Sequence, residues 1–193
     1  MQAPQETIQQ AITIASGGGI IIYPTDTAFG IGCRIDNHAA VTRLFTIRRR
    51  PVTQAIPALV SSQSMALAYF DNPSDIVRRL MKKYWPGALT IIAPCKKDLI
   101  YSPIRGNRET VGLRMPDHQT ILKIIQGVGV PVLGPSANFH QDPTPYRIED
   151  LNSELIGLVD YVVPGVCSVR LASTVVDCSV QPCKIIRQGA VKI

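Results

Sequence analysis

A short run of consecutive apolar residues, Gly19-Ile-Ile-Ile-Tyr23, lies between the glycines at 17–19 and Pro24. Such a run is typical of a strand covered on both faces, because a strand with one solvated face alternates apolar and polar residues. Before it, apolar residues recur at near-helical spacing from Ile8 to Ala15, which predicts a helix that ends at the glycines. A helix followed by a doubly covered strand favours a layered α/β fold.

The same two patterns continue along the chain. They predict helices over 37–48, 74–84 and 117–126, and strands over 56–60, 88–93, 110–114 and 130–133. We expect segment 25–32 to be a turn. Near the C-terminus, short strands at 161–163, 174–176 and 184–186 have no long helix between them, which indicates that part of the sheet is antiparallel. The predicted fold class is α/β: a single domain over residues 1–193 with a twisted mixed parallel and antiparallel sheet flanked by helices.

Charge and cysteine usage narrow the functional classes. The chain has 20 Lys and Arg against 14 Asp and Glu, a formal charge of +6. This excess favours anionic partners such as nucleotides, phosphates or RNA, although it is also common as a means of staying soluble. The N-terminus has no secretory pattern and no apolar window reaches membrane-spanning length, so we expect a cytoplasmic protein without membrane contact. The five irregularly spaced cysteines are interpreted as small apolar residues rather than disulfides or zinc ligands.

Several polar clusters directly follow the predicted strands, where open α/β sheets place their ligand clefts. One is Tyr23-Pro-Thr-Asp-Thr27, and another is Gly134-Pro-Ser-Ala-Asn138. The first cluster has two interpretations. It is either part of a ligand site or a turn whose Thr and Asp side chains bind local backbone amides.

Two groups of arginines have equally open interpretations. The run Arg48-Arg49-Arg50 ends a predicted helix, where cations are favoured by the helix dipole, but one or two of these side chains could instead bind a phosphate. Of the three, Arg50 beside Pro51 is the better candidate. Arg114 interrupts a strand that is otherwise suited to burial. A buried guanidinium needs a carboxylate, which comes either from a ligand or from an ion pair within the chain.

The sequence contains no P-loop, no Gly-x-Gly-x-x-Gly opening a helix and no His-Glu-x-x-His. Taken in order, however, its segments resemble the YrdC-like family of threonylcarbamoyl-AMP synthases over residues 18–191. The resemblance rests on Tyr23-Pro-Thr-Asp-Thr27, Arg50-Pro51, Trp85-Pro-Gly-Ala-Leu-Thr90, Arg114-Met-Pro116, Pro135-Ser-Ala-Asn138, Ser173-Thr-Val-Val-Asp177 and Arg187-Gln-Gly189.

This resemblance implies an open basic concave cleft and a nucleotidyltransferase activity. Members of the family condense L-threonine, bicarbonate and ATP into L-threonylcarbamoyl-AMP and release pyrophosphate, for threonylcarbamoyladenosine modification of tRNA. The resemblance implies that Mg²⁺ arrives with ATP and that the protein has no metal site of its own. Its partners would include downstream threonylcarbamoyl-transfer proteins.

The resemblance also implies roles for individual residues. Two arginines would act as catalytic residues on the phosphates: Arg48 and Arg50. The threonine-binding residues would be Thr27, Arg114, Gly134 and Ser173. The ATP-binding residues would be Arg50, Gln54, Thr110, Ser136, Asn138, Thr144 and Arg187. No role is assigned to the three histidines His38, His118 and His140.

Several positions depart from the family pattern, and two of them bear on the substrate. Arg48 stands where the family usually has a lysine, and Leu59 stands where it often has a histidine. These departures leave open a paralogue of the same fold that acts on another small molecule. A non-catalytic RNA-binding module is the other alternative, although only 6% of the residues are aromatic and no stacking platform is evident.

Overall fold

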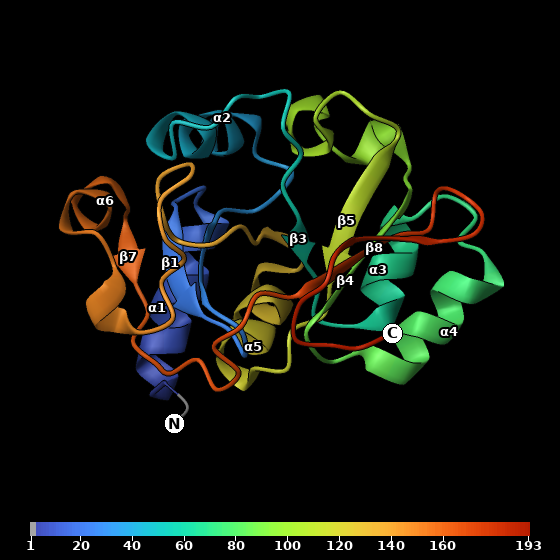
Figure 1. Cartoon of the computed structure of the whole chain (residues 1–193). Coiled ribbons are helices and arrows are strands. Elements are labelled where there is room, and N and C mark those ends of the chain that lie inside the picture. Colours follow the sequence, from blue (N-terminus) through green and yellow to red (C-terminus); the bar gives the residue numbers. More distant parts are fainter. Residues whose placement is uncertain (1–2) are drawn as a thin grey trace.

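The computed structural model describes residues 3–193. Helices and strands follow one another along the chain in the order that the apolar patterns predict (Figure 1). The helices are α1 (Gln5–Ser16), α2 (His38–Ile47), α3 (Gln63–Tyr69), α4 (Asp75–Tyr84), α5 (Gln119–Val128) and α6 (Ser153–Leu158), with single 3-10 turns at Lys97–Leu99, Ser102–Arg105 and Ile148–Asp150. The strands are β1 (Ile21–Pro24), β2 (Phe29–Gly32), β3 (Ala58–Leu59), β4 (Leu89–Pro94), β5 (Thr110–Arg114), β6 (Val132–Leu133), β7 (Tyr161–Val162), β8 (Thr174–Asp177) and β9 (Lys184–Arg187).

The strands form two mixed sheets. The smaller sheet has the order β2-β1-β7, in which β1 pairs antiparallel with β2 and parallel with β7. The larger sheet has the order β6-β3-β5-β4-β8-β9 and also mixes both directions. Isolated bridges from Gly30 to Ser136 and from Arg34 to Val132 connect the region of β2 with that of β6. The predicted fold class is confirmed, but its strands lie in two adjoining sheets.

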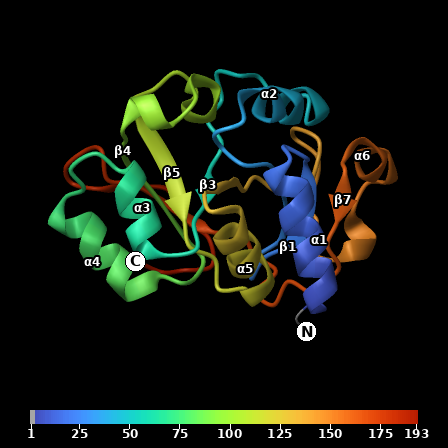
Figure 2. The same ribbon diagram turned by 180° about the vertical axis from the view of Figure 1, so that it is seen from behind.

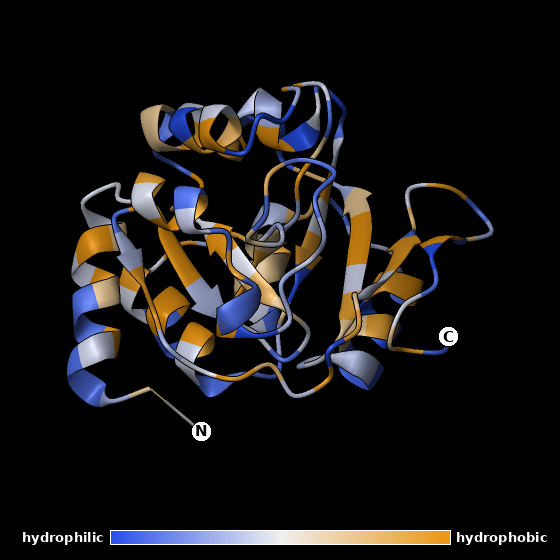
Figure 3. Ribbon diagram, turned by 60° about the vertical axis from the view of Figure 1, so that its left-hand side comes forward, coloured by the Kyte–Doolittle hydropathy of each residue, from blue (hydrophilic) through white to orange (hydrophobic). Residues whose placement is uncertain are grey.

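Strand β1 is covered on both faces, as its apolar run predicts. Ile21 and Tyr23 belong to a cluster of buried side chains with α1 and α5, whereas Ile20 and Ile22 belong to a cluster that includes α2. Figure 2 shows α1 and α5 together on one side of β1, and Figure 3 shows hydrophobic residues concentrated in the strands and the inner faces of the helices. The alternation of the strand therefore distributes its side chains between two cores.

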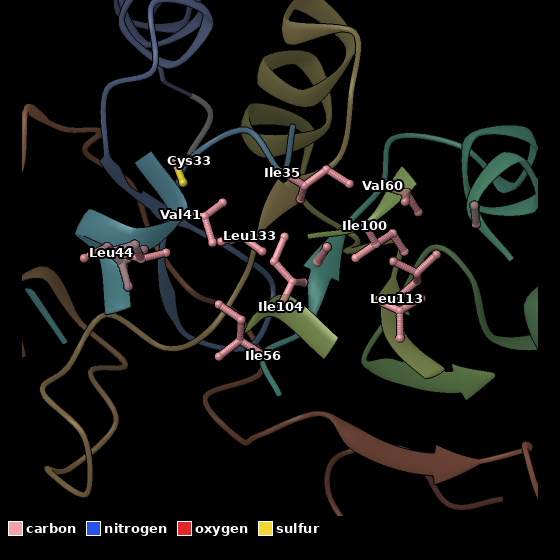
Figure 4. Packing of buried hydrophobic residues seen from close by; sticks show 14 of the residues in the cluster. Cys33, Ile35, Val41, Leu44, Ile56, Val60, Ile100, Ile104, Leu113 and Leu133 are labelled. Atoms are coloured by element: carbon pink, nitrogen blue, oxygen red, sulfur yellow. The ribbon is translucent and has the colours of Figure 1, made fainter. Parts of the chain in front are cut away.

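The larger sheet is apolar on one face and more polar on the other. Leu113 on β5 packs with residues of α2 and of the loops before β5, among the side chains shown in Figure 4. Ile91 on β4 belongs to the same cluster, which α4 also covers. Because side chains alternate along a strand, Thr90 and Arg114 point to the opposite face. That face carries the candidate site.

The structure corrects the prediction for segment 25–32. Phe29–Gly32 is a strand, and only the residues before it form a turn. The glycines obscured this strand, but they are required by close packing: a Cβ on Gly30 would lie 2.7 Å from the Tyr23 ring, and one on Gly32 would lie 1.8 Å from the Leu133 carbonyl oxygen.

Two short helices, α3 and α6, were also not predicted, and α5 begins two residues later than expected, at Gln119. The remaining predicted helices and strands are present with boundaries shifted by a few residues. Within the described part of the chain, every helix is too short or too polar to cross a membrane.

Candidate active site

A pocket with a volume of about 200 Å³ is lined by residues of both sheets and of the loops between them. We call it the arginine pocket, because four guanidinium groups reach its wall. Most residues that the resemblance assigned to a site line it: Thr27, Arg48, Arg50, Arg114, Gly134, Ser136, Thr144, Ser173 and Arg187. Residues more than 150 positions apart in the sequence therefore converge on one cavity.

Arg48 is buried at the end of α2 and has no counterion among the residues that the structure describes. It is 3% exposed, and its Nε and Nη2 donate to the backbone carbonyl and Oδ1 of Asn138, each at 3.1 Å. Its Nη1 is buried and has no hydrogen-bond partner within residues 3–193. Burial, and secondly the charge of Arg50, lower the pKa of Arg48 to about 10. Arg48 lines the arginine pocket, and an anion that entered it would compensate this buried charge.

Arg50 is held by the backbone that follows it. Its Nε donates to the Gln54 carbonyl at 3.2 Å and its Nη2 to the Ala55 carbonyl at 2.8 Å. Nδ1 of His140 lies 3.3 Å from Nη1 of Arg50. Burial lowers the pKa of Arg50. Arg49 points elsewhere, to Glu154 at 2.5 Å. Two of the three adjacent arginines, Arg48 and Arg50, therefore line the pocket.

Arg114 forms an ion pair within the chain, which is one of the two alternatives that the sequence left open for its carboxylate partner. Its Nη2 donates to Oδ1 of Asp26, and the two side chains are 7% and 4% exposed. Its Nη1 donates to Oγ1 of Thr27 at 2.7 Å, and its Nε to the Gly87 carbonyl at 3.0 Å. Burial lowers the pKa of Arg114, and the Asp26 carboxylate opposes that effect. Arg114 thus lines the pocket while it is already paired, and a ligand carboxylate there would share it with Asp26.

The turn after β1 combines both interpretations of the Tyr23–Thr27 cluster. Oγ1 of Thr25 accepts from the backbone N–H groups of Thr27 and Ala28, which is the local turn interpretation. Thr25 and Thr27 nevertheless line the arginine pocket.

The opposite wall is formed by the β8–β9 region. Arg187 donates through Nε to the Ser173 carbonyl at 3.0 Å and through Nη2 to the Ser173 hydroxyl at 3.1 Å. The Ser173 hydroxyl also lies 3.0 Å from that of Thr90. Both hydroxyls and the guanidinium therefore form one hydrogen-bonded group at the pocket wall. The backbone N–H of Gly134 is already bonded to the Pro57 carbonyl at 2.8 Å, which leaves its carbonyl for a ligand.

Three of the expected ATP-binding residues do not line the pocket: Gln54, Thr110 and Asn138. Gln54 is exposed, and its backbone carbonyl holds Arg50. Thr110 shares a strand face with Arg114 but lies four residues away, about 13 Å along the strand. Asn138 stands behind Arg48 and also accepts from the Ser136 hydroxyl at 2.7 Å.

Sequence reasoning assigned no role to some residues that the structure places at the site. Thr90, Leu59 and Thr25 line the pocket, and His140 contacts Arg50. For Thr90 a signal existed, because the Trp85–Thr90 segment was among the family motifs. For His140 the one signal was its place in the loop after Asn138, and its contact with Arg50 depends on how that loop folds back.

The pocket is strongly cationic. Arg48, Arg50 and Arg187 form no ion pair with any carboxylate in residues 3–193. The carboxylate that contacts a pocket arginine in these residues is that of Asp26, which pairs with Arg114. The same residues contain no cluster of three potential metal-binding side chains. Hydroxyl groups surround the arginines. This arrangement suits a ligand with several negatively charged oxygens.

The family model named Sua5_yciO_yrdC, with the description telomere recombination, matches residues 13–189. The chain belongs to the Sua5/YciO/YrdC family. The YrdC-like resemblance inferred from its motifs is therefore confirmed. Family membership places the arginine pocket in a fold that this chain shares with proteins of known structure.

The chain is similar to two threonylcarbamoyl-AMP synthases and to one Sua5 protein of known structure. Threonylcarbamoyl-AMP synthase of Bacillus subtilis is 31% identical over 188 residues, which cover 95% of this chain and 54% of that protein. Threonylcarbamoyl-AMP synthase of Vibrio cholerae is 30% identical over 186 residues, 95% of this chain and 98% of that protein. The crystal structure of P. abyssi Sua5 complexed with L-threonine matches with a TM-score of 0.90 and 27% identity, covering 94% of this chain and 54% of that one. The chain thus spans about half the length of two of these relatives.

Proposed function

We propose that this chain synthesises L-threonylcarbamoyl-AMP from L-threonine, bicarbonate and ATP, with release of pyrophosphate. The main support is the charge of Arg48, which is buried on the pocket wall and forms no ion pair with a carboxylate in residues 3–193. A buried cation of this kind is stabilised when an anion enters. Relatives named threonylcarbamoyl-AMP synthase, and a relative complexed with L-threonine, indicate which anions these are.

On this proposal, the phosphates of ATP lie against Arg48, Arg50 and Arg187. The reaction brings a carbamate to the α-phosphate and expels pyrophosphate, so negative charge must be held close together and increases on the leaving group. Fixed guanidinium groups oppose that repulsion without having to reorganise. Ser136 and Thr144 line the same pocket and would hold the nucleotide. Mg²⁺ would enter on the phosphates of ATP, as part of the substrate.

L-threonine would lie nearer to Thr27, Arg114 and Ser173. Its carboxylate would receive a charge-assisted bond from Arg114, whose orientation is set by Asp26 and by the Thr27 hydroxyl. Arrangement of the three reactants, rather than a covalent nucleophile on the protein, would account for the rate. The product would pass to threonylcarbamoyl-transfer proteins that act on tRNA, in the cytoplasm.

The test is pyrophosphate release by the purified chain with ATP, Mg²⁺ and bicarbonate, with each amino acid supplied in turn. We expect release that depends on threonine and that is abolished by Arg48→Met. The matched control is Arg78→Met, which removes an exposed arginine on α4 and should leave the rate unchanged. Release without any amino-acid dependence, or equal rates for both variants, would contradict the proposal.

A second candidate is the same adenylation chemistry with a different amino acid. It is favoured by the apolar part of the wall, where Leu59 lies with Ile56 and Phe29 and packs closely on Gly134. The same assay separates the two functions, because a more hydrophobic amino acid would then give faster pyrophosphate release than threonine. Tight RNA binding with no pyrophosphate release would instead favour the RNA-binding module.

A further inference from the structure

The β8–β9 hairpin carries a cysteine at each end of its connecting segment. The strands are in antiparallel register with Val176 opposite Ile185 and Asp177 opposite Lys184. One step further along the same register, Cys178 faces Cys183. Facing residues of an antiparallel pair have Cα atoms about 4.5–5.5 Å apart and side chains on the same face of the sheet. These values fall within the range of about 4.4–6.8 Å that disulfides require.

The position of both thiols is fixed by contacts that do not depend on them. The backbone N–H of Cys178 donates to the Ile92 carbonyl at 2.8 Å, which ties the segment to β4. Oδ1 of Asp177 accepts from the backbone N–H and hydroxyl of Ser179 at 2.9 and 2.6 Å, which fixes the start of the turn. Cys178 belongs to the main hydrophobic cluster, and Cys183 packs against that cluster. Both side chains therefore point to the same side of the hairpin.

We propose that Cys178 and Cys183 are an oxidative modification site, a preformed thiol pair that closes into a disulfide in the presence of a peroxide. The two thiols together lose two protons and two electrons, and hydrogen peroxide accepts them and becomes two water molecules. Sulfur of Cys183 first attacks the peroxide, giving a sulfenic acid and one water. Sulfur of Cys178 then displaces the hydroxyl from that sulfenic acid, which leaves as the second water while the S–S bond forms.

The order of these steps follows from accessibility. Cys33, Cys95, Cys167 and Cys178 are buried, with exposures of 0%, 4%, 0% and 8%, whereas Cys183 is partly exposed. The pKa of Cys178 is raised, first by burial and then by a hydrogen bond with Cys183. Peroxide therefore reaches Cys183 first, and the buried Cys178 is the resolving thiol.

The hairpin connects this pair to the arginine pocket. Ser173 precedes β8 and Arg187 ends β9, so both pocket residues lie at the end of the hairpin opposite the cysteines. A bulge between Val175 and Val176 shifts the register between the two ends. A disulfide would fix the hairpin on the far side of the bulge, and it would do so whether or not the proposed synthase activity is correct.

The experiment is peptide mapping of the full-length chain before and after treatment with hydrogen peroxide. Trypsin cuts after Arg170 and Lys184, so the peptide 171–184 contains both cysteines and no other. We expect this peptide to lose two hydrogens on oxidation and to regain them with dithiothreitol. We also expect the Tm of the oxidised chain to rise by roughly 4–8 °C, since a short loop has been closed.

Three variants make the result decisive. Cys183→Ser should leave Cys178 unmodified by peroxide, because that thiol is buried, and should abolish the rise in Tm. Cys178→Ala should stop Cys183 at the sulfenic acid or carry it to higher oxides. Cys95→Ala is the control, since the Cys95 thiol donates to the Glu109 carbonyl and should not affect the pair. Disulfides between two chains, unpaired oxidation of Cys183 in the wild type, or an unchanged Tm would each overturn the proposal.

Discussion

The arginine pocket contains two buried arginines whose substitution by methionine should affect stability to very different extents. Arg48 is 3% exposed and has no carboxylate partner in residues 3–193, whereas Arg114 is 6% exposed and is paired with Asp26. Removing an unpaired buried charge relieves a desolvation cost, but removing one member of a buried pair leaves the other charge without compensation. We therefore predict that Arg48→Met and Arg114→Met differ sharply in stability.

The magnitudes follow from the contacts. The pKa of Arg48 is lowered from 12.5 to about 10, which corresponds to about 3 kcal/mol against the charged form. The substitution relieves that cost and removes two hydrogen bonds to Asn138, worth about 1.5 kcal/mol each. The free energy of unfolding should thus change by less than about 1 kcal/mol. Arg114→Met leaves Asp26 buried and unpaired and should cost about 3–5 kcal/mol.

Urea unfolding of the two variants measures this difference directly. The double variant Asp26→Asn with Arg114→Met removes both charges and should recover most of the loss, which separates charge from packing. In the presence of ATP and Mg²⁺, the wild type should gain stability and Arg48→Met should not. Equal destabilisation by Arg48→Met and Arg114→Met would refute the view that Arg48 is uncompensated in the free protein.

Two further predictions concern stability outside the pocket. Burial lowers the pKa of His118 below 6.5, so the unfolded chain binds a proton more readily than the folded chain. The stability that this residue contributes is therefore complete above pH 6.5 and is lost as the pH falls below that value. His118→Gln should reduce this loss in acid unfolding measurements. Gly32→Ala should cost about 3 kcal/mol or more, because its Cβ would clash with the Leu133 carbonyl. Gly157→Ala in α6 has open space around its Cβ and should stabilise the protein by about 0.5–1 kcal/mol. A similar effect of both substitutions on Tm would contradict this packing.

The sequence predicted individual helices and strands better than it predicted how the strands pair into sheets. Long apolar patterns such as those of α1, β1 and α5 are local properties, and they were identified correctly. Strand β2 was missed because its alternate positions are glycines, whose presence reflects the contact with Tyr23 and Leu133 rather than any local preference. The division into two sheets depends on pairing between distant strands, which no local pattern encodes.

At the site, motif resemblance predicted which residues converge but not what each one contacts. Arg114 illustrates the limit: a charge in an apolar strand requires a partner, and only the fold shows that Asp26 supplies it. Thr110 illustrates another, since it shares a strand face with Arg114 but does not line the arginine pocket. Hydrogen bonding behind the wall, such as that of Asn138 to Arg48, depends on the loop after β6.

We predict that phosphate binding depends on the neutrality of Asn138, the residue that holds Arg48. Its two bonded nitrogens are held by an amide side chain and a backbone carbonyl, which fix the guanidinium without cancelling its charge. Asn138→Asp would place a carboxylate oxygen 3.1 Å from Nη2, the present position of Oδ1. The charge would then be compensated before any ligand binds, and the new carboxylate would repel phosphates.

We expect Asn138→Asp to weaken ATP binding at least about tenfold, since only 1.4 kcal/mol of added repulsion is needed. The variant also replaces the bond from Nδ2 to the Asp142 carbonyl, 2.5 Å in the wild type, with a contact between two acceptors. Asn138→Ala is therefore the matched control, because it loses the same bond and the hold on Arg48 without adding charge. Calorimetric titration with ATP and Mg²⁺ should give a weaker affinity for the aspartate variant than for the alanine variant, and the difference should shrink as salt is added. Equal affinities would mean that Asn138 serves only to position Arg48 and that the neutrality of its side chain is irrelevant to phosphate binding.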